Sequence, residues 1–208
     1  MLKSAGAPQE FPLSTKQRIV EAAFQTIIEE GFAGTSARAI ARRGGFNQAL
    51  IFYHFGTLND LLLAVLDKSS AERMTRYREA INRSSSLPEK IHTATELYRE
   101  DLDSGHITVI SELIAGSLAR PDLGPEVVDR LQPWIDFAEE TIALVLRDSG
   151  LTEVIPPRTL AFAVVALYIG VDLLSHLDKD DSRAEALFQT AGAMGPLLAP
   201  LLSENPEG

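Results

Sequence analysis

The sequence predicts an all-α protein of about nine helices. Over most of the 208 residues, apolar side chains recur at intervals of three and four, which places them on one face of a helix. No segment alternates apolar and polar residues as a half-buried strand does. With 45% hydrophobic and 23% charged residues, the composition is typical of a chain that folds around a core.

The first helix is predicted to begin at Ser14 or Thr15, because either hydroxyl can cap a helix N-terminus. Gly31 is placed to end this helix in a left-handed conformation, and Phe32 can then fold back against its last turn. Residues 1–13 are polar and are expected to form a flexible N-terminal arm.

Three further helices follow closely. The second is predicted to begin near residues 35–36 and to stop at the glycine pair 44–45, where a positive φ costs little. Asn47 is a good N-cap for a third helix over residues 48–52 or slightly further. A fourth helix is expected to begin near Thr57 and to run to about residue 83, leaving the N-terminal region and continuing into the rest of the chain.

Turn-forming residues divide the remainder into about five more helices, several of which begin with proline at the first helical position. The expected joints lie at residues 84–88, 103–105, 120–125, 149–157 and 178–182.

Composition excludes several function classes. The chain has no cysteine, so a disulfide scaffold, a thiolate metal site and a cysteine nucleophile are excluded. Residues 1–11 lack the apolar core of a secretory signal. The longest uncharged apolar stretch, residues 159–171, is shorter than the ~20 residues that span a bilayer. We therefore expect a cytoplasmic protein with no membrane partner and no cofactor.

Charge is distributed unevenly along the chain. The net charge is −10, yet residues 1–58 carry six basic and four acidic residues. The remaining residues, 59–208, carry 13 basic and 25 acidic residues. A weakly basic N-terminal region on an acidic body is compatible with DNA binding by the N-terminal region alone.

The most specific motif lies in residues 31–62, GFAGTSARAIARRGGFNQALIFYHFGTLNDLL. Two short helices joined by a glycine-containing turn form a helix-turn-helix pattern. This segment closely resembles the DNA-binding segment of the TetR family of bacterial transcriptional regulators. The shared pattern is a glycine and an aromatic residue, Thr-Ser, a helix with Ile-Ala, and then Tyr-His-Phe before a Leu-Leu pair. The resemblance covers roughly residues 14–66.

This resemblance implies a domain organisation and a function. Residues 14–58 would form the helix-turn-helix domain, and residues 59–208 a ligand-binding and dimerisation domain. The chain would be a ligand-responsive regulator, most simply a repressor, that binds double-stranded DNA at a palindromic operator as a homodimer and is released by a small-molecule effector. Two alternatives stay open: a DNA-binding regulator without ligand response, and a helical enzyme, for which only the pair His92 and Glu96 hints at a metal site.

Base contacts are expected at the N-terminus of the third helix, because that end of a recognition helix reaches base edges in the major groove. Gln48 can pair with adenine, and Ala49 can touch a thymine methyl group. Arg38 would contact either a base or a phosphate. The candidates for base contact are Arg38, Asn47, Gln48 and Ala49.

Phosphate contacts are expected from hydroxyls and helix N-termini, and the resemblance adds the end of the recognition helix. His54 could instead be a packed structural imidazole, and Arg42 and Arg43 would form a solvated positive face. The candidates are Thr35, Ser36, Tyr53, His54 and Thr57.

Two positions depart from the family pattern. Relatives usually carry tyrosine where this chain has Phe52 and lysine where it has Leu58. Both usual residues tend to meet phosphates, so we expect weaker non-specific DNA binding and a shallower salt dependence than in a typical relative.

Two long helices near the C-terminus, over residues 157–176 and 183–202, are apolar enough to be buried on both sides. The resemblance implies that these helices pair with the same helices of a second chain. A core within one chain is the alternative. The expected interface residues are Phe162, Val165, Leu187, Phe188, Ala191 and Met194.

The helices between these two regions carry further apolar residues, which in the family enclose an effector pocket and which could otherwise be plain core. Glu112, Tyr168 and Asp172 are polar residues among apolar neighbours and could orient a ligand. The expected pocket residues are Tyr98, Leu102, Ile110, Leu113, Ile114, Trp134, Phe137 and Tyr168.

Overall fold

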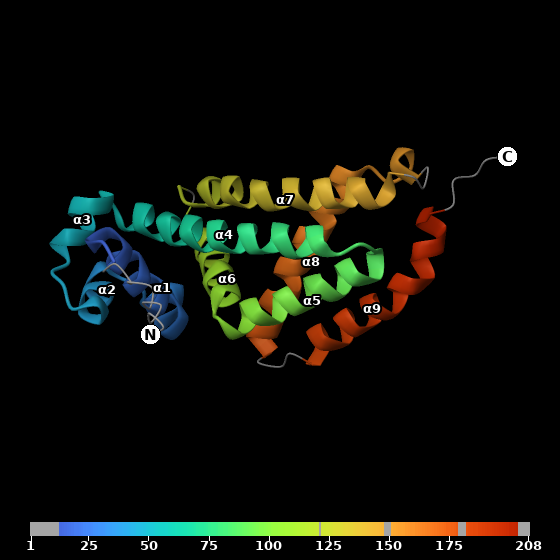
Figure 1. Cartoon of the computed structure of the whole chain (residues 1–208). Coiled ribbons are helices and arrows are strands. Elements are labelled where there is room, and N and C mark those ends of the chain that lie inside the picture. The colour runs from blue at the N-terminus through green and yellow to red at the C-terminus, as the bar shows by residue number, and fades with distance from the viewer. Residues whose placement is uncertain (1–12, 121, 148–150, 179–181, 204–208) are drawn as a thin grey trace, which may run out of the picture.

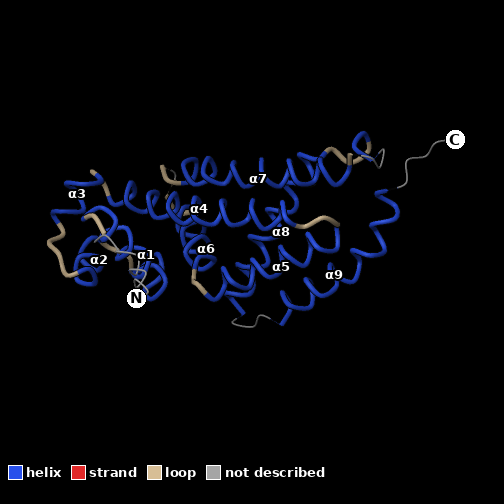
Figure 2. Tube along the Cα trace, in the orientation of Figure 1, coloured by secondary structure: helices blue, strands red, loops and turns tan. Residues whose placement is uncertain are grey.

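The computed structural model describes residues 13–120, 122–147, 151–178 and 182–203. Within these ranges it contains nine α-helices, one turn of 3-10 helix at Leu151–Glu153 and no strand, which confirms the all-α prediction (Figures 1 and 2). The helices are α1 Thr15–Gly34, α2 Ala37–Gly44, α3 Ala49–Phe55, α4 Leu58–Arg83, α5 Leu87–Asp103, α6 His106–Ser117, α7 Gly124–Leu146, α8 Pro157–Asp178 and α9 Ser182–Ser203.

Helix α1 begins at a capping box. The Ser14 hydroxyl accepts a hydrogen bond from the Gln17 backbone N–H, and the Gln17 side chain accepts one from the Ser14 N–H. Gly31 interrupts the helix with a positive φ of 66°, as the sequence predicted. Phe32 differs from expectation, because its ring packs against Gly116 of α6, where an added Cβ would come within 2.3 Å of it.

The turn between α2 and α3 is set by two glycines. Gly45 adopts a φ of 66° at the end of α2, and a Cβ on Gly44 would come within 2.0 Å of the Phe46 ring. Helix α3 begins one residue later than predicted and extends to Phe55. The Asn47 side chain still supports its start, since Oδ1 accepts a hydrogen bond of 2.9 Å from the Ala49 N–H.

Helix α4 connects the two parts of the molecule. It leaves α1–α3 and runs along the body, with α7 beside it (Figure 1). The main apolar core continues across this junction, since it combines Ile19 and Ile27 of α1 with Leu66 of α4 and Val109 and Leu113 of α6. The N-terminal helices and the first part of the body therefore share one core.

Candidate nucleic-acid interface and internal cavity

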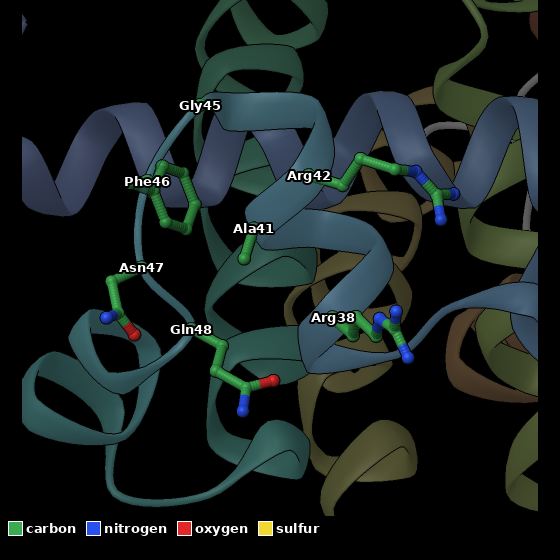
Figure 3. Close-up of a pocket in the computed structure, with 7 residues that line it drawn as sticks. All are labelled: Arg38, Ala41, Arg42, Gly45, Phe46, Asn47 and Gln48. Carbon is green, nitrogen blue, oxygen red and sulfur yellow. The ribbon is translucent and has the colours of Figure 1, made fainter.

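The N-terminus of α3 presents the expected base-contacting residues to solvent. Asn47, Gln48 and Ala49 are all exposed. Together with Arg38 of α2, Asn47 and Gln48 line a shallow open pocket at the turn (Figure 3). Arg38 is exposed and makes no ion pair with any residue that the structure describes. Side chains of α2 and of the turn before α3 thus line one open pocket.

The expected phosphate contacts divide into two groups. Thr35 is buried, and its hydroxyl donates a hydrogen bond of 2.6 Å to the Gly31 carbonyl, so this side chain is not available for DNA. Ser36 is exposed and caps α2 by accepting a hydrogen bond from the Ala39 N–H. Thr57 is exposed and caps α4. Of these three residues, the two caps remain in contact with solvent.

The end of α3 carries an exposed aromatic side chain. Tyr53 is 82% exposed, and its ring meets the half-buried His54 edge-on at a centroid distance of 5.0 Å. An apolar ring this exposed has few intramolecular contacts, so its position is not explained by the core.

Two arginines that were expected to form a solvated positive face are instead paired with α1. Arg42 Nη2 lies 2.9 Å from Glu30 Oε1, and Arg43 forms an ion pair with Glu29. These contacts neutralise part of the positive charge of the N-terminal region and leave Arg38 as the more available cation.

Residues 19–65 match the model of a family described as bacterial regulatory proteins, tetR family. This match covers both helices of the helix-turn-helix and their capping residues. Residues 19–65 are a DNA-binding domain of the TetR family of bacterial regulators. A chain with this helix-turn-helix is a transcriptional regulator rather than an enzyme.

Other TetR-family proteins are similar over different lengths. The HTH-type transcriptional regulator UidR of Escherichia coli strain K12 is 22% identical over 84% of this chain and 87% of its own length. The HTH-type transcriptional repressor Rv3405c of Mycobacterium tuberculosis is 49% identical over 24% of this chain and 26% of its own. A crystal structure of a TetR-family regulator from a Rhodococcus species has the same fold, with a TM-score of 0.73 and 17% identity over 86% of this chain and 97% of that one.

The two departures from the TetR pattern have different surroundings. Phe52 is 48% exposed beside Tyr53 on α3. Leu58 is the first residue of α4 and packs partly against the main core. The leucine therefore contributes to packing at a position where the resemblance led us to expect a cation.

A cavity of about 340 Å³ lies within the body of the regulator, between α4, α5, α6, α7, α8 and α9. Its size is at the lower end of the range for small-molecule pockets. Five of the expected pocket residues line it, namely Tyr98, Ile110, Trp134, Phe137 and Tyr168. The other three lie elsewhere: Leu113 and Ile114 in the main core, and Leu102 in a small cluster with Tyr98.

A buried polar network forms one wall of this cavity and was missed from the sequence. Arg73 of α4 is only 3% exposed, and its Nε donates a hydrogen bond of 2.6 Å to Asp101 of α5. Tyr77 donates to the same carboxylate at 2.8 Å, and Arg73 Nη2 donates to the Tyr168 hydroxyl at 2.8 Å. Burial raises the pKa of both Tyr77 and Tyr168, so both phenols are neutral.

The sequence did contain a signal for this network. Residues 66, 69, 73, 77 and 81 follow the helical spacing of three and four, and all of them are buried. A charged residue within such a stripe indicates a buried ion pair.

The contact between the DNA-binding helices and the body is formed by α6. Glu112 Oε2 accepts a hydrogen bond of 2.6 Å from the Phe32 backbone N–H, next to the positive φ of Gly31. Arg120 lies over the Phe32 ring, 4.9 Å from its centroid. Glu112 was expected to orient a ligand and is instead part of this contact. Asp172 is buried but is not among the residues that line the cavity.

Helices α8 and α9 expose apolar side chains over much of their length. Phe162, Leu174 and Met194 are 63%, 64% and 47% exposed, and Leu187 lies at the edge between cavity and solvent. Three further residues expected in a dimer interface, Val165, Phe188 and Ala191, line the cavity. Figure 1 shows α9 bending along its length, and Pro196 lies within this helix.

Residues Pro157–Ser175 of α8 are long and apolar enough to cross a membrane by length and composition alone, with a mean hydropathy of 1.6. The shorter uncharged stretch considered from the sequence understated this property, because the helix includes two charged positions. A buried interface helix has the same composition.

Proposed function

We propose that this TetR-family regulator is a homodimeric, ligand-responsive repressor, which binds a palindromic operator and is released by a small molecule. The observation that carries the proposal is the exposed N-terminus of α3, joined through a shared core to a body that contains a partly enclosed cavity. The curated name of the Mycobacterium tuberculosis relative, a repressor, supports the direction of regulation. Binding to the chromosome would place the protein in the cytoplasm.

In this proposal α3 enters the major groove and α2 lies across it. Gln48 hydrogen-bonds adenine and Ala49 contacts a thymine methyl group, while Arg38 contacts a base or phosphate beside them. Ser36, Tyr53, His54 and Thr57 contact the backbone and fix the orientation of the helix.

The apolar residues exposed on α8 and α9 support the dimer. Patches of this kind on a folded protein mark interaction surfaces. On α8, residues 163, 167, 170, 174 and 177 follow a spacing of four and three, which forms a continuous seam. A two-fold axis at this seam would place two copies of α3 in successive major grooves.

The cavity and the contact between α1 and α6 support a ligand response. The cavity wall includes α4, which begins at the DNA-binding part, and α6, which holds Phe32 through Glu112. A ligand that favours a different position of these helices would change the separation of the two recognition helices. Release requires that the ligand bind the two conformations with different affinity.

The first experiment selects bound sequences from a random duplex DNA library with the purified protein. An enriched inverted repeat, with half-sites about one helical turn apart, is expected. Enrichment of a single half-site, or of none by a folded and dimeric protein, would contradict the proposal.

We expect Gln48→Ala to weaken operator binding by about 1–3 kcal/mol per half-site and to relax base preference at one position of each half-site. Competition between base-substituted operators measures both effects. Gln132→Ala on α7, outside the DNA-binding helices, is the control and should bind as the wild type does. Unchanged discrimination in the Gln48 variant would assign base reading to other residues.

We expect Leu58→Lys to strengthen DNA binding at low salt and to steepen the dependence of log affinity on log salt by about 1 per protomer. Leu58 is half-buried at the start of α4, so the lysine stem can keep the packing while the ammonium reaches a phosphate. Leu144→Lys adds the same charge at an exposed position on α7 and should not change the slope. If Leu58→Lys and Leu144→Lys give the same salt dependence, Leu58 is not near a phosphate.

A further inference from the structure

The internal cavity has a wall of very uneven polarity. Among the described residues that line it, Arg73 is the one that carries a charge. The remaining wall is apolar or aromatic, with neutral hydroxyls from a few tyrosines and a threonine. Inside an apolar cavity a charge is weakly screened, so this cation dominates the electrostatic environment of any bound molecule.

The hydrogen-bonding capacity of Arg73 is not fully used within the chain. Its Nε and Nη2 donate to Asp101 and Tyr168, whereas Nη1 is buried and has no hydrogen-bond partner among the described residues. A buried donor without a partner is costly, and more so on a charged group. The guanidinium lies 4.9 Å from the centroid of the Trp134 ring, so it is held at the cavity wall.

The carboxylate beside this wall is shared by two arginines. The Asp101 carboxylate pairs with two guanidinium groups, those of Arg73 and Arg76. Tyr77 and Tyr168 contribute no negative charge, because burial raises the pKa of both hydroxyls. Arg76 is further balanced by Glu100 at the surface, 3.4 Å away. Arg73 therefore shares its buried carboxylate with a second, partly exposed arginine, and its Nη1 is left to pair with an anion in the cavity.

We propose that the cavity binds an organic carboxylate with an apolar body. One carboxylate oxygen accepts a hydrogen bond from Arg73 Nη1, and the apolar body lies against Ile81, Phe137, Val164 and Ile169. Charge-assisted hydrogen bonds of this kind are about twice as strong as neutral ones. The inference rests on the proposed ligand response, for which it names the chemical class of the effector.

Trp134 supplies a direct signal for binding, because it is the only tryptophan of the chain and lines the cavity. We would follow its fluorescence while adding octanoate, octanol or octylammonium, which share one apolar chain and differ in the head group. Octanoate is expected to bind about tenfold or more tightly than octanol, and octylammonium more weakly than either. Equal binding of octanoate and octanol, or no binding of octanoate, would overturn the inference.

Two variants locate the head group. Arg73→Gln should lose the preference for octanoate while keeping the affinity for octanol. Arg76→Gln is the matched control, since Arg76 shares Asp101 but does not line the cavity, and it should keep the preference. If Arg73→Gln keeps the preference, the inference fails. If this variant does not fold, the comparison of the three probes on the wild-type protein still shows whether the cavity prefers a carboxylate.

Gel-shift assays with the selected operator separate this inference from the proposed function. If octanoate binds through Arg73 but leaves operator binding unchanged at saturation, the carboxylate site stands and ligand release by this probe fails. If octanol releases the operator while octanoate does not bind, ligand release stands and the carboxylate site is wrong.

Discussion

Leu174→Glu is expected to convert the protein into a monomer that no longer holds its operator. Leu174 is 64% exposed and lies on the α8 seam, toward the C-terminal end of the helix. In a two-fold dimer the variant places an unpaired carboxylate from each chain in an apolar interface, at a cost of several kcal/mol per buried charge. We expect the dimer to weaken by a factor of about a thousand or more. Sedimentation measures the mass, and gel-shift assays measure operator binding.

Val128→Glu is the matched control for this prediction. Val128 is 63% exposed on α7, outside α8 and α9, so the same change should leave the dimer and the operator affinity intact. Phe162→Glu, at another exposed apolar position of α8, should repeat the effect of Leu174→Glu. A dimeric Leu174 variant with wild-type affinity would show that the chains associate through another surface.

Asp101→Asn is expected to lower the free energy of unfolding by about 3–5 kcal/mol. Asp101 is fully buried and accepts hydrogen bonds from Arg73 and Tyr77. Asparagine has nearly the same size, so the change removes the charge and leaves the Arg73 guanidinium buried without a counter-ion. For a chain of this length the midpoint of thermal unfolding should fall by roughly 6–20 °C.

Urea unfolding, followed by circular dichroism, measures this loss in the free energy of unfolding. Asp103→Asn, an exposed position on the same helix, should change stability by less than about 0.5 kcal/mol. A loss below about 1 kcal/mol in the Asp101 variant would mean that the network is hydrated or can rearrange.

The N-terminal helices could be predicted closely because their ends depend on neighbouring residues. Ser14 and Thr57 cap helices through contacts three residues away, and Gly31 and Gly45 adopt the positive φ that their positions suggested. Thr35 shows the limit of such reasoning. Its hydroxyl was assigned to DNA because it lies near a helix start, but it turns back to the Gly31 carbonyl.

The body could be predicted less well, because its contacts join residues far apart in the chain. The sequence of α8 is apolar on nearly every side, so it did not indicate which side faces inward. In the structure, Asp172 and Ser175 are buried and Tyr168 lines the cavity, so these polar side chains mark the side of α8 that faces inward. Glu112 was likewise recognised as unusual, but its partner Phe32 lies 80 positions away.

The ion pairs of Arg42 and Arg43 with α1 affect how the protein searches the genome. Because these cations are already satisfied by Glu30 and Glu29, contact with random DNA displaces few counterions and holds the protein only briefly. The excess of acidic residues in the body adds repulsion from the phosphates. We therefore expect sliding along the duplex to be short and the operator to be reached mainly by repeated encounters from solution. The many random sites of a chromosome would then sequester little of the protein.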